Sequence, residues 1–251
     1  MLENLARPAV IAHRGARAHA PENTLAAFSL AVQQQADAIE LDATLSADGH
    51  VVIIHDNTVN RTTNGSGKVS RLPLKTLKGL DAGSSYDIAF RGEQIPTLEE
   101  VFLTVGKDII INIELKANLT SIGQLTEQVV KCVKNHNMSD RVFFSSFNIF
   151  ALRRLAKLLP KVPRGLLTLK GVAGIFSQKK ILDLVFCQSL HIHHQDARQS
   201  LVNRVQRQER KVFSYTVNHP EDIKRLIALG IDGIFTDDPL RTKRIIADWK
   251  S

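Results

Sequence analysis

Three acidic side chains occur at alternate positions within short apolar segments of this 251-residue sequence. Glu40 and Asp42 lie in the segment 38–45, and Glu114 lies in the segment 109–115. Side chains two residues apart in a β-strand point to the same face, so we expect the three carboxylates to face inward together. Burying like charges is strongly unfavourable unless a cation neutralises them. Because every ligand would be an oxygen atom, the pattern predicts one hard divalent cation, Mg²⁺ or Ca²⁺, rather than zinc.

Two histidines and two basic residues accompany these acids at the ends of apolar segments. His13 and Arg14 close one segment, His55 closes another, and Lys116 follows Glu114 at a spacing of two. A divalent cation with an arginine and a lysine suits a substrate that carries a phosphoryl group, because positive charge stabilises the phosphoryl oxygens. One imidazole would then accept a proton while the other donates one. The residues alone do not assign which histidine is the acid.

Apolar segments alternate with amphipathic segments along the whole chain. The apolar segments are rich in Val, Ile, Leu or Phe, as expected for strands that are buried on both faces. Eight strands, each followed by a helix, predict the α/β class and a single (β/α)8 TIM-type barrel, with a doubly wound sheet as the alternative. The predicted strands are 9–13, 38–45, 109–115, 142–146, 165–169, 189–193, 211–217 and 233–236. The predicted helices are 22–35, 97–106, 121–135, 148–159, 174–185, 198–209, 220–229 and 239–249.

One further apolar segment, 51–55, interrupts this alternation and predicts a β-hairpin arm. It follows the strand 38–45 closely, and Asp48-Gly49 between the two is a strong hairpin signal. With a two-residue loop at Asp48-Gly49, His55 would lie directly opposite Asp42. The irregular segment 57–96 is too long for an ordinary connection. We therefore expect one domain over residues 1–251, with a small insertion at about 57–96.

Composition excludes several classes of protein. The chain is 43% hydrophobic and 23% charged, and it lacks an apolar run of about 18 residues, so we expect no transmembrane helix and no stable membrane insertion. The start of the sequence carries no apolar secretory signal. Cys132 and Cys187 are far apart in the sequence, and we expect both to be inert core residues. Together these features favour a reducing cytoplasm.

The net charge of +8 is concentrated in the second half of the chain. Residues 1–125 contain 11 basic and 14 acidic residues, whereas residues 126–251 contain 22 and 11. Solvated helix faces explain such an excess, and attraction of anionic substrates or lipid surfaces is the alternative. Aromatic residues make up only 6% and do not alternate with the basic ones, so we expect no nucleic-acid partner. The sequence does not indicate an oligomeric state.

Seven motifs, in this order along the chain, resemble those of glycerophosphodiester phosphodiesterases. The resemblance extends from about residue 9 to residue 240, and the short insertion is similar to that of the cytosolic bacterial type. The motifs are His13-Arg-Gly15, Pro21-Glu-Asn-Thr24, Glu40-Leu-Asp42, His55-Asp56, Ile113-Glu-Leu-Lys116, Tyr215-Thr-Val-Asn218 and Gly233-Ile-Phe-Thr-Asp-Asp238.

The resemblance implies a TIM-type barrel that hydrolyses glycerophosphodiesters to glycerol 3-phosphate and an alcohol. It implies that His13 and His55 form the general acid–base pair, and that Glu40, Asp42 and Glu114 bind the metal. The nucleophile, water or a glycerol hydroxyl of the substrate, stays open. The implied substrate- and phosphate-binding residues are Arg14, Lys116, Glu22, Asn23, Tyr215 and Asn218.

Some of these positions have a structural interpretation as well. The segment 21–24 is typical of a helix start, and Asp237 and Asp238 before a proline are expected to cap a helix. His191 and His193 share one strand face, but no third ligand accompanies them, so a zinc site is not favoured. We expect His193 to line the substrate pocket.

Three other functions are alternatives. A lysophospholipase D-like hydrolase would use the same chemistry on an acylated glycerol, but the insertion lacks a long apolar surface for an acyl chain. A non-catalytic barrel that binds phosphodiesters would not need both histidines, and both are present. Nucleic-acid binding through the basic second half would show strong salt dependence.

Overall fold

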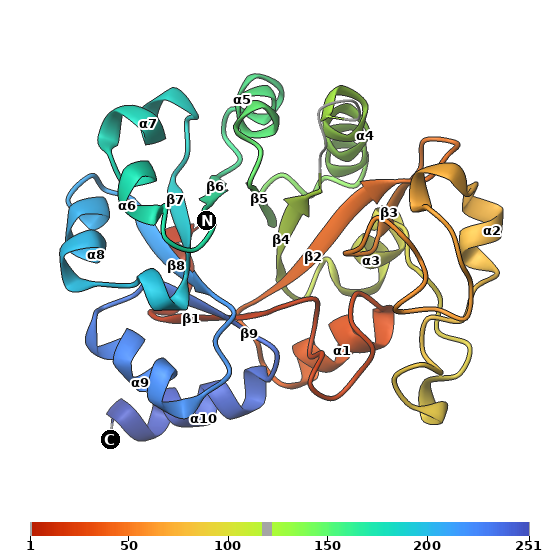
Figure 1. The fold of residues 1–251 in the computed structure, drawn as a ribbon, viewed down its shortest axis with the longest axis horizontal. Coiled ribbons are helices and arrows are strands. Elements are labelled where there is room, and N and C mark those ends of the chain that lie inside the picture. The colour runs from red at the N-terminus through yellow and green to blue at the C-terminus, as the bar shows by residue number, and fades with distance from the viewer. Residues whose placement is uncertain (1, 117–121, 251) are drawn as a thin grey trace.

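The computed structural model describes residues 2–116 and 122–250 of the chain. The strands of the barrel are β1 (Ala9–Ala12), β2 (Ala38–Leu45), β4 (Ile110–Leu115), β5 (Val142–Ser146), β6 (Arg164–Leu167), β7 (Ser189–His193), β8 (Lys211–Tyr215) and β9 (Gly233–Thr236). Each pairs in parallel with the next, and β1 pairs with both β9 and β2, so the sheet closes (Figure 1). The predicted (β/α)8 barrel is confirmed, and the open, doubly wound sheet is wrong.

Helices surround this barrel, and their amphipathic sequences turn apolar faces to the strands (Figure 1). They are α1 (Leu25–Gln33), α3 (Leu98–Val105), α4 (Ile122–Asn135), α5 (Ile149–Leu158), α6 (Ala173–Phe176), α7 (Lys179–Leu184), α8 (Gln199–Gln206), α9 (Pro220–Ala228) and α10 (Pro239–Lys250). In the described residues, every helix is too short or too polar to cross a lipid bilayer.

The helix predicted over 174–185 is divided into α6 and α7. Ser177 lies between them, and its hydroxyl donates to the carbonyl oxygen of Gly174 at 2.8 Å. Arg204 of α8 donates to the same hydroxyl at 3.2 Å. A serine side chain that bonds nearby backbone competes with helical hydrogen bonding. The continuous helix was therefore the wrong prediction for this segment.

Alternate residues of the strands face two different apolar regions. Ile39 and Leu41 of β2 pack between the strands and the surrounding helices. Phe143, Phe213 and Phe235, from three other strands, pack inside the barrel in a separate cluster. This alternation is what a closed sheet requires, because its inner face must be filled by side chains. The polar residues on the inner face of β2 and β4 therefore lie within the barrel, next to this apolar cluster.

The hairpin arm consists of β2 and β3 (Val51–Ile53), and its register differs from the predicted one. Leu45 pairs with Val51 and Ala43 with Ile53, so Ile54, not His55, lies opposite Asp42. The loop has one residue more than predicted. A two-residue Asp-Gly loop needs a positive φ at both residues, and of the two only Gly49 has one, at +83°. His55 follows β3 and is not part of the ladder.

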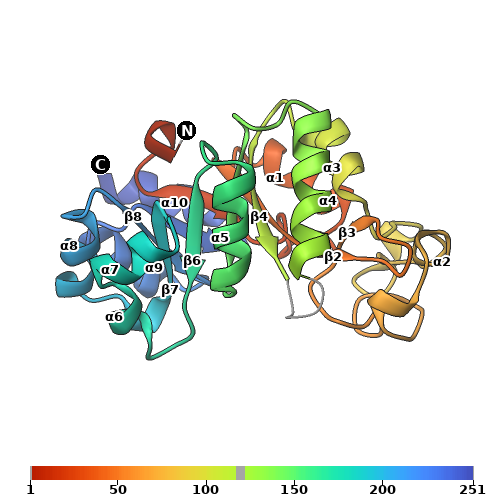
Figure 2. The same cartoon turned by 90° about the horizontal axis from the view of Figure 1, so that it is seen from above.

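The segment 57–96 contains the helix α2 (Leu74–Lys78) and the 3-10 turns Val69–Arg71 and Ile88–Phe90. It has an apolar cluster of its own, in which Val59 and Leu77 pack against Val52 and Ile54 of the hairpin arm. Figure 2 shows this segment near the carboxyl end of β4, away from the N-terminal 3-10 helix. It therefore lies beside the end of the barrel where the polar side chains gather.

Candidate active site

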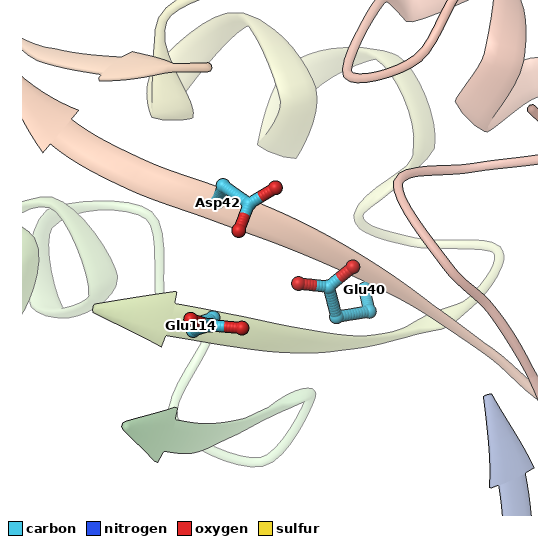
Figure 3. A group of neighbouring side chains, drawn as sticks. All are labelled: Glu40, Asp42 and Glu114. Carbon is cyan, nitrogen blue, oxygen red and sulfur yellow. The ribbon is translucent and has the colours of Figure 1, made fainter. Parts of the chain in front are cut away.

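The three predicted carboxylates meet inside the barrel. Oxygen atoms of Glu40, Asp42 and Glu114 all lie within 4.8 Å of one another. Asp42 of β2 is paired with Glu114 of β4, and Glu40 precedes Asp42 by two residues on the same face. Figure 3 shows the three carboxylate groups directed toward one another from the two neighbouring strands. Among the described residues, this is the one group of acidic, histidine and cysteine side chains that could hold a metal ion.

Burial sets the electrostatics of this cluster. It acts with the charges of Asp42 and Glu114 to raise the pKa of Glu40 well above its usual range. Burial and the charge of Asp42 also raise the pKa of Glu114 to about 7. Burial opposes ionisation of Asp42 too, but the charges of Arg14 and Lys116 hold the pKa of Asp42 below its usual range. Three carboxylates in one buried place therefore cannot all ionise easily without added positive charge.

The donor set fits a hard divalent cation. Glu40 is 2% exposed and Asp42 is 1% exposed, so water solvates neither carboxylate well. The Oε1 atom of Glu40 is buried and has no hydrogen-bond partner among the described residues. An unpaired carboxylate oxygen in such a place is costly unless a ligand completes it. Oxygen-only coordination is the kind that Mg²⁺ and Ca²⁺ prefer.

Basic and amide groups surround the carboxylates. The backbone N–H of Arg14, a residue in the left-handed region at φ 56°, donates to Glu40 Oε2 at 2.9 Å. Asn23 Nδ2 donates to Asp42 Oδ2 at 2.9 Å. Lys116 Nζ lies 3.1 Å from Glu114 Oε1. The structure thus brings Arg14, Asn23 and Lys116 to the cluster through the carboxylates themselves.

Each of the two histidines is oriented by an aspartate. His13 Nδ1 lies 2.8 Å from Asp237 Oδ1, and His55 Nδ1 lies 2.7 Å from Asp56 Oδ1. A carboxylate at Nδ1 favours the tautomer with the proton on that nitrogen, so Nε2 of a neutral ring carries the lone pair. Burial lowers the pKa of both imidazoles from the ordinary histidine value. Both rings can therefore be neutral near pH 7.

A cavity of about 180 Å³ lies between the two histidines. Phe147, Leu167, Tyr215 and Phe235 form its apolar wall. The Tyr215 hydroxyl donates to the backbone oxygen of Thr168, which fixes the ring at the edge of the cavity. The polar residues lining this cavity are His13, Arg14, Glu40, His55, Glu114, Lys116, Ser145 and Thr216.

A second, wider cavity of about 830 Å³ lies beside the first. Both cavities are lined by His55, Glu114, Lys116 and Phe147. The small cavity has room for the reacting group, and the wider one offers space for a substituent of the substrate.

Three other predicted residues contact the site indirectly. Glu22 accepts hydrogen bonds from the guanidinium groups of Arg14 and Arg61. Asn218 bonds both the side chain and the backbone N–H of Asp237, at 2.8 and 2.9 Å. The Nδ1 atom of His193 accepts from the backbone N–H of Gln195. The ring of His193 also packs edge-on against the ring of Tyr215, with 6.1 Å between the ring centres. The described lining of the small cavity includes none of these three residues.

Asp237 does not cap a helix as predicted, and Arg61 contacts the site although no role was predicted for it. Asp238 caps α10 by accepting from the backbone N–H of Arg241 at 3.0 Å, whereas Asp237 orients His13. The Asp-Asp-Pro pattern does not distinguish the two aspartates. Arg61 bonds both Glu22 and Asp56, and no sequence motif assigned it a role.

Comparison with known proteins identifies the family of the chain. The model of the glycerophosphoryl diester phosphodiesterase family matches residues 13–241. A glycerophosphodiester phosphodiesterase of Caldanaerobacter subterraneus subsp. tengcongensis is 43% identical over 231 residues, which is 92% of this chain and 94% of that protein.

Two solved structures extend this similarity. An Oleispira antarctica phosphodiesterase, in complex with the product sn-glycerol-3-phosphate, is 35% identical, with a TM-score of 0.91 over 96% of this chain and 97% of that one. A glycerophosphodiester phosphodiesterase of Agrobacterium tumefaciens is 28% identical, with a TM-score of 0.82 over 94% of this chain and 99% of that one. The chain belongs to the glycerophosphoryl diester phosphodiesterase family and is an enzyme of the phosphoric diester hydrolase class.

Proposed function

We propose that this protein hydrolyses small glycerophosphodiesters to glycerol 3-phosphate and an alcohol, in a reaction that needs Mg²⁺ or Ca²⁺. The observation that carries this proposal is the meeting of three carboxylates, two of them buried, beside a cavity that is lined by two oriented imidazoles. The product bound to the Oleispira antarctica relative supports the same class of substrate.

Glu40, Asp42 and Glu114 would hold the divalent cation. When bound, such a cation supplies positive charge that offsets the charge of a phosphoryl group in the transition state. The raised pKa values of Glu40 and Glu114 support this assignment, because a neighbouring cation would favour their ionised forms. Nothing in this donor set favours magnesium over calcium.

Arg14 and Lys116 bind the phosphoryl oxygens of the substrate. Both line the small cavity, and both are anchored by carboxylates. The bond between Arg14 NH1 and Glu22 at 2.9 Å fixes one edge of the guanidinium, so its position is set before the substrate arrives. Cationic groups placed in advance stabilise developing negative charge more effectively than groups that must move.

His13 and His55 move the protons. One imidazole accepts the proton of the attacking hydroxyl, whether that belongs to water or to the glycerol of the substrate. The other, in its protonated imidazolium form, donates its Nε2 proton to the departing alcohol oxygen, and the aspartate at Nδ1 stabilises that charged form. Because Asp237 and Asp56 both occupy Nδ1 atoms, Nε2 is the nitrogen of each ring that serves the substrate.

The test is an assay for glycerol 3-phosphate release from glycerophosphocholine by the purified protein, with Mg²⁺ and with Ca²⁺. We expect EDTA to abolish release and either cation to restore it. The E114Q variant should lose most activity and bind Ca²⁺ more weakly in calorimetry, because one charged ligand is missing. E221Q, which changes an exposed glutamate of α9, is the matched control. Full activity in EDTA would contradict the metal assignment.

A lysophospholipid is the second candidate substrate class. Phe147, Ile149 and Phe150 line the wider cavity, and the Phe150 side chain is exposed, so an apolar substituent could lie there. The same assay with lysophosphatidylcholine separates the two classes. A kcat/KM higher for the lysophospholipid than for glycerophosphocholine would replace the proposed substrate.

We also propose a reducing compartment, the cytoplasm, for this protein. Cys132 and Cys187 are free thiols. Burial raises the pKa of both thiols to about 12, so neither is reactive at neutral pH. Cell fractionation against cytoplasmic and secreted marker proteins tests this location; recovery with the secreted markers would contradict it.

A further inference from the structure

The guanidinium group of Arg61 joins the insertion to the candidate active site. Its Nε donates to Asp56 Oδ2 at 2.7 Å, and its NH2 lies 3.2 Å from Asp56 Oδ1. NH1 and NH2 donate to the two oxygens of Glu22 at 2.9 and 2.7 Å. Each of the two carboxylates thus contacts two nitrogen atoms of the guanidinium, and this bidentate pairing is the strongest geometry available to an arginine.

Arg61 holds this position although its side chain is 48% exposed. It lies in a turn where both the N–H and the hydroxyl of Thr63 donate to the Val59 oxygen, at 3.1 and 2.7 Å. Val59 is fully buried in the apolar cluster of the insertion. An exposed ion pair usually contributes little, because its side chains must be ordered first. Here the turn and the two bidentate contacts supply that order.

The two partners of Arg61 each position a different group of the site. Asp56 bonds Nδ1 of His55, and Glu22 bonds NH1 of Arg14. The contacts also keep both partners ionised. Although burial opposes it, the bonds from Arg61 and the charge of Arg14 hold the pKa of Glu22 at about 2. The hydrogen bond from Arg61 lowers the pKa of Asp56.

A second arginine provides an internal comparison. Arg17 also approaches Glu22, at 3.6 Å, and Asp237, the partner of His13, at 3.5 Å. These distances exceed ordinary hydrogen bonds, and Asp237 is held by Asn218 in any case. Arg17 therefore adds charge near His13, whereas Arg61 fixes geometry near His55.

We propose that Arg61 is a positioning residue of the hydrolase, which holds His55 through Asp56 and Arg14 through Glu22. This inference rests on the proposed function. It makes the insertion part of the catalytic apparatus: an imidazole that transfers protons and a guanidinium that binds phosphate are aligned by one side chain from outside the barrel. Loss of Arg61 leaves the metal cluster intact and releases the two groups beside it.

The first experiment compares the R61M, R61K, R17M and R91M variants in the assay with glycerophosphocholine. R61M should lower kcat about tenfold, through His55, and raise KM several-fold, through Arg14, as is common when partners of site residues are lost. R61K should retain more activity than R61M but less than the unchanged protein, because an ammonium group cannot form bidentate hydrogen bonds with two carboxylates at once. R17M should cost about threefold or less. R91M changes an exposed arginine of the same insertion and should match the unchanged protein.

The second experiment asks whether Arg61 acts through Asp56. The loss caused by R61M should be smaller when D56N is already present, since residues that act through one another are not additive. Nitrogen-15 spectra of the histidine rings, assigned with H55A, should show the Nδ1-protonated form of His55 in the unchanged protein and a tautomer mixture in R61M.

These results separate the inference from the proposed function. A R61M protein that equals R91M in kcat, KM and His55 spectrum overturns the role of Arg61. A full R61M loss on top of D56N shows that it does not act through Asp56. If the unchanged protein releases no glycerol 3-phosphate, the proposed function fails, and the nitrogen spectra still decide whether Arg61 orders His55. If R61M does not fold, R61K carries the same comparison.

Discussion

The two histidines of the site do the same kind of chemistry from different surroundings. His13 directly follows β1, its side chain is 16% exposed, and its partner Asp237 directly follows β9, the strand beside β1. His55 follows the hairpin arm, its side chain is 33% exposed, and its partner Asp56 is the next residue. The barrel strands therefore position the ring of His13, whereas the hairpin and the insertion position the ring of His55.

This difference shows how much of the site the barrel alone can provide. Closure of the sheet brings β9 beside β1, so the position of His13 follows from the packing of the barrel. His55 lies beyond the last ladder pair of β3 and depends on local contacts, among them its own with Asp56 and those of Asp56 with Arg61. Rigid elements hold catalytic groups more reliably than loops do, so a loop-borne group needs added supports.

The largest expected effect comes from removing either ring. H13A and H55A should each lower kcat about 100-fold or more, the size expected of a general acid or base. The H13A/H55A double variant should lose less than the product of the two, because the rings act in one reaction. Near-normal kcat in either single variant would remove that histidine from the mechanism.

A substrate with a better leaving group sharpens this test into an assignment. The general acid assists departure of the alcohol, so its removal should matter less when the alcohol leaves easily. A glycerophosphodiester of nitrophenol should therefore rescue only one of the two variants. The rescued one identifies the acid; equal rescue of both would contradict a division of roles.

A smaller effect is expected from the aspartates that orient the rings. D237N should lower kcat about 30-fold and D56N about tenfold, because a wrong tautomer is favoured in both. The loss should be larger for D237N, since His13 is the more buried ring and water reaches it less well than His55. The measurement is kcat with glycerophosphocholine, and E221Q again serves as the control. A D56N loss larger than that of D237N would reverse the comparison.

The smallest effect concerns a third histidine that the barrel buries completely. His191 is 0% exposed among aromatic rings, and a Cβ at position 165 would come within 2.1 Å of its Nε2, so glycine is required there. Burial lowers the pKa of His191 to about 3. Below pH 6.5 the His191 side chain of the unfolded chain binds a proton, whereas that of the folded chain stays neutral. The free energy of unfolding therefore decreases as the pH is lowered.

This penalty amounts to about 2 kcal/mol at pH 5 for one such group. Denaturation of the unchanged protein and of H191L at pH 7 and pH 5 measures it. The loss on acidification should be about 2 kcal/mol smaller in H191L, and the cost of the substitution itself cancels in that difference. Equal losses in the two proteins would show that His191 is not the group responsible.

The parts of the site that the sequence revealed are those with a local pattern. Glu40, Asp42 and Glu114 were predicted to share a face because strand alternation is a property of neighbouring residues. The barrel itself followed from the repeated order of strand and helix segments. Residues such as Glu22 and Asn23 were found through a resemblance in short motifs, which likewise depend on nearby positions.

The parts that the sequence concealed depend on tertiary contacts or on one backbone angle. Asp237 meets His13 from 224 positions away, and the pattern around it suggested only a helix cap. The predicted hairpin register is wrong because Asp48 lacks the positive φ that a two-residue loop requires, and the loop is one residue longer. Arg61 lies in an irregular segment, where periodicity gives no indication of which side chain returns to the barrel.

Pairing of the first and last strands has a consequence for the order in which the site forms during synthesis of the chain. A growing chain that has already emerged with its carboxylates and both imidazoles still lacks the aspartate that aligns the earlier ring. The aligned form of His13 is therefore complete only once β9 has docked against β1, and β9 is the last strand of the chain to be synthesised.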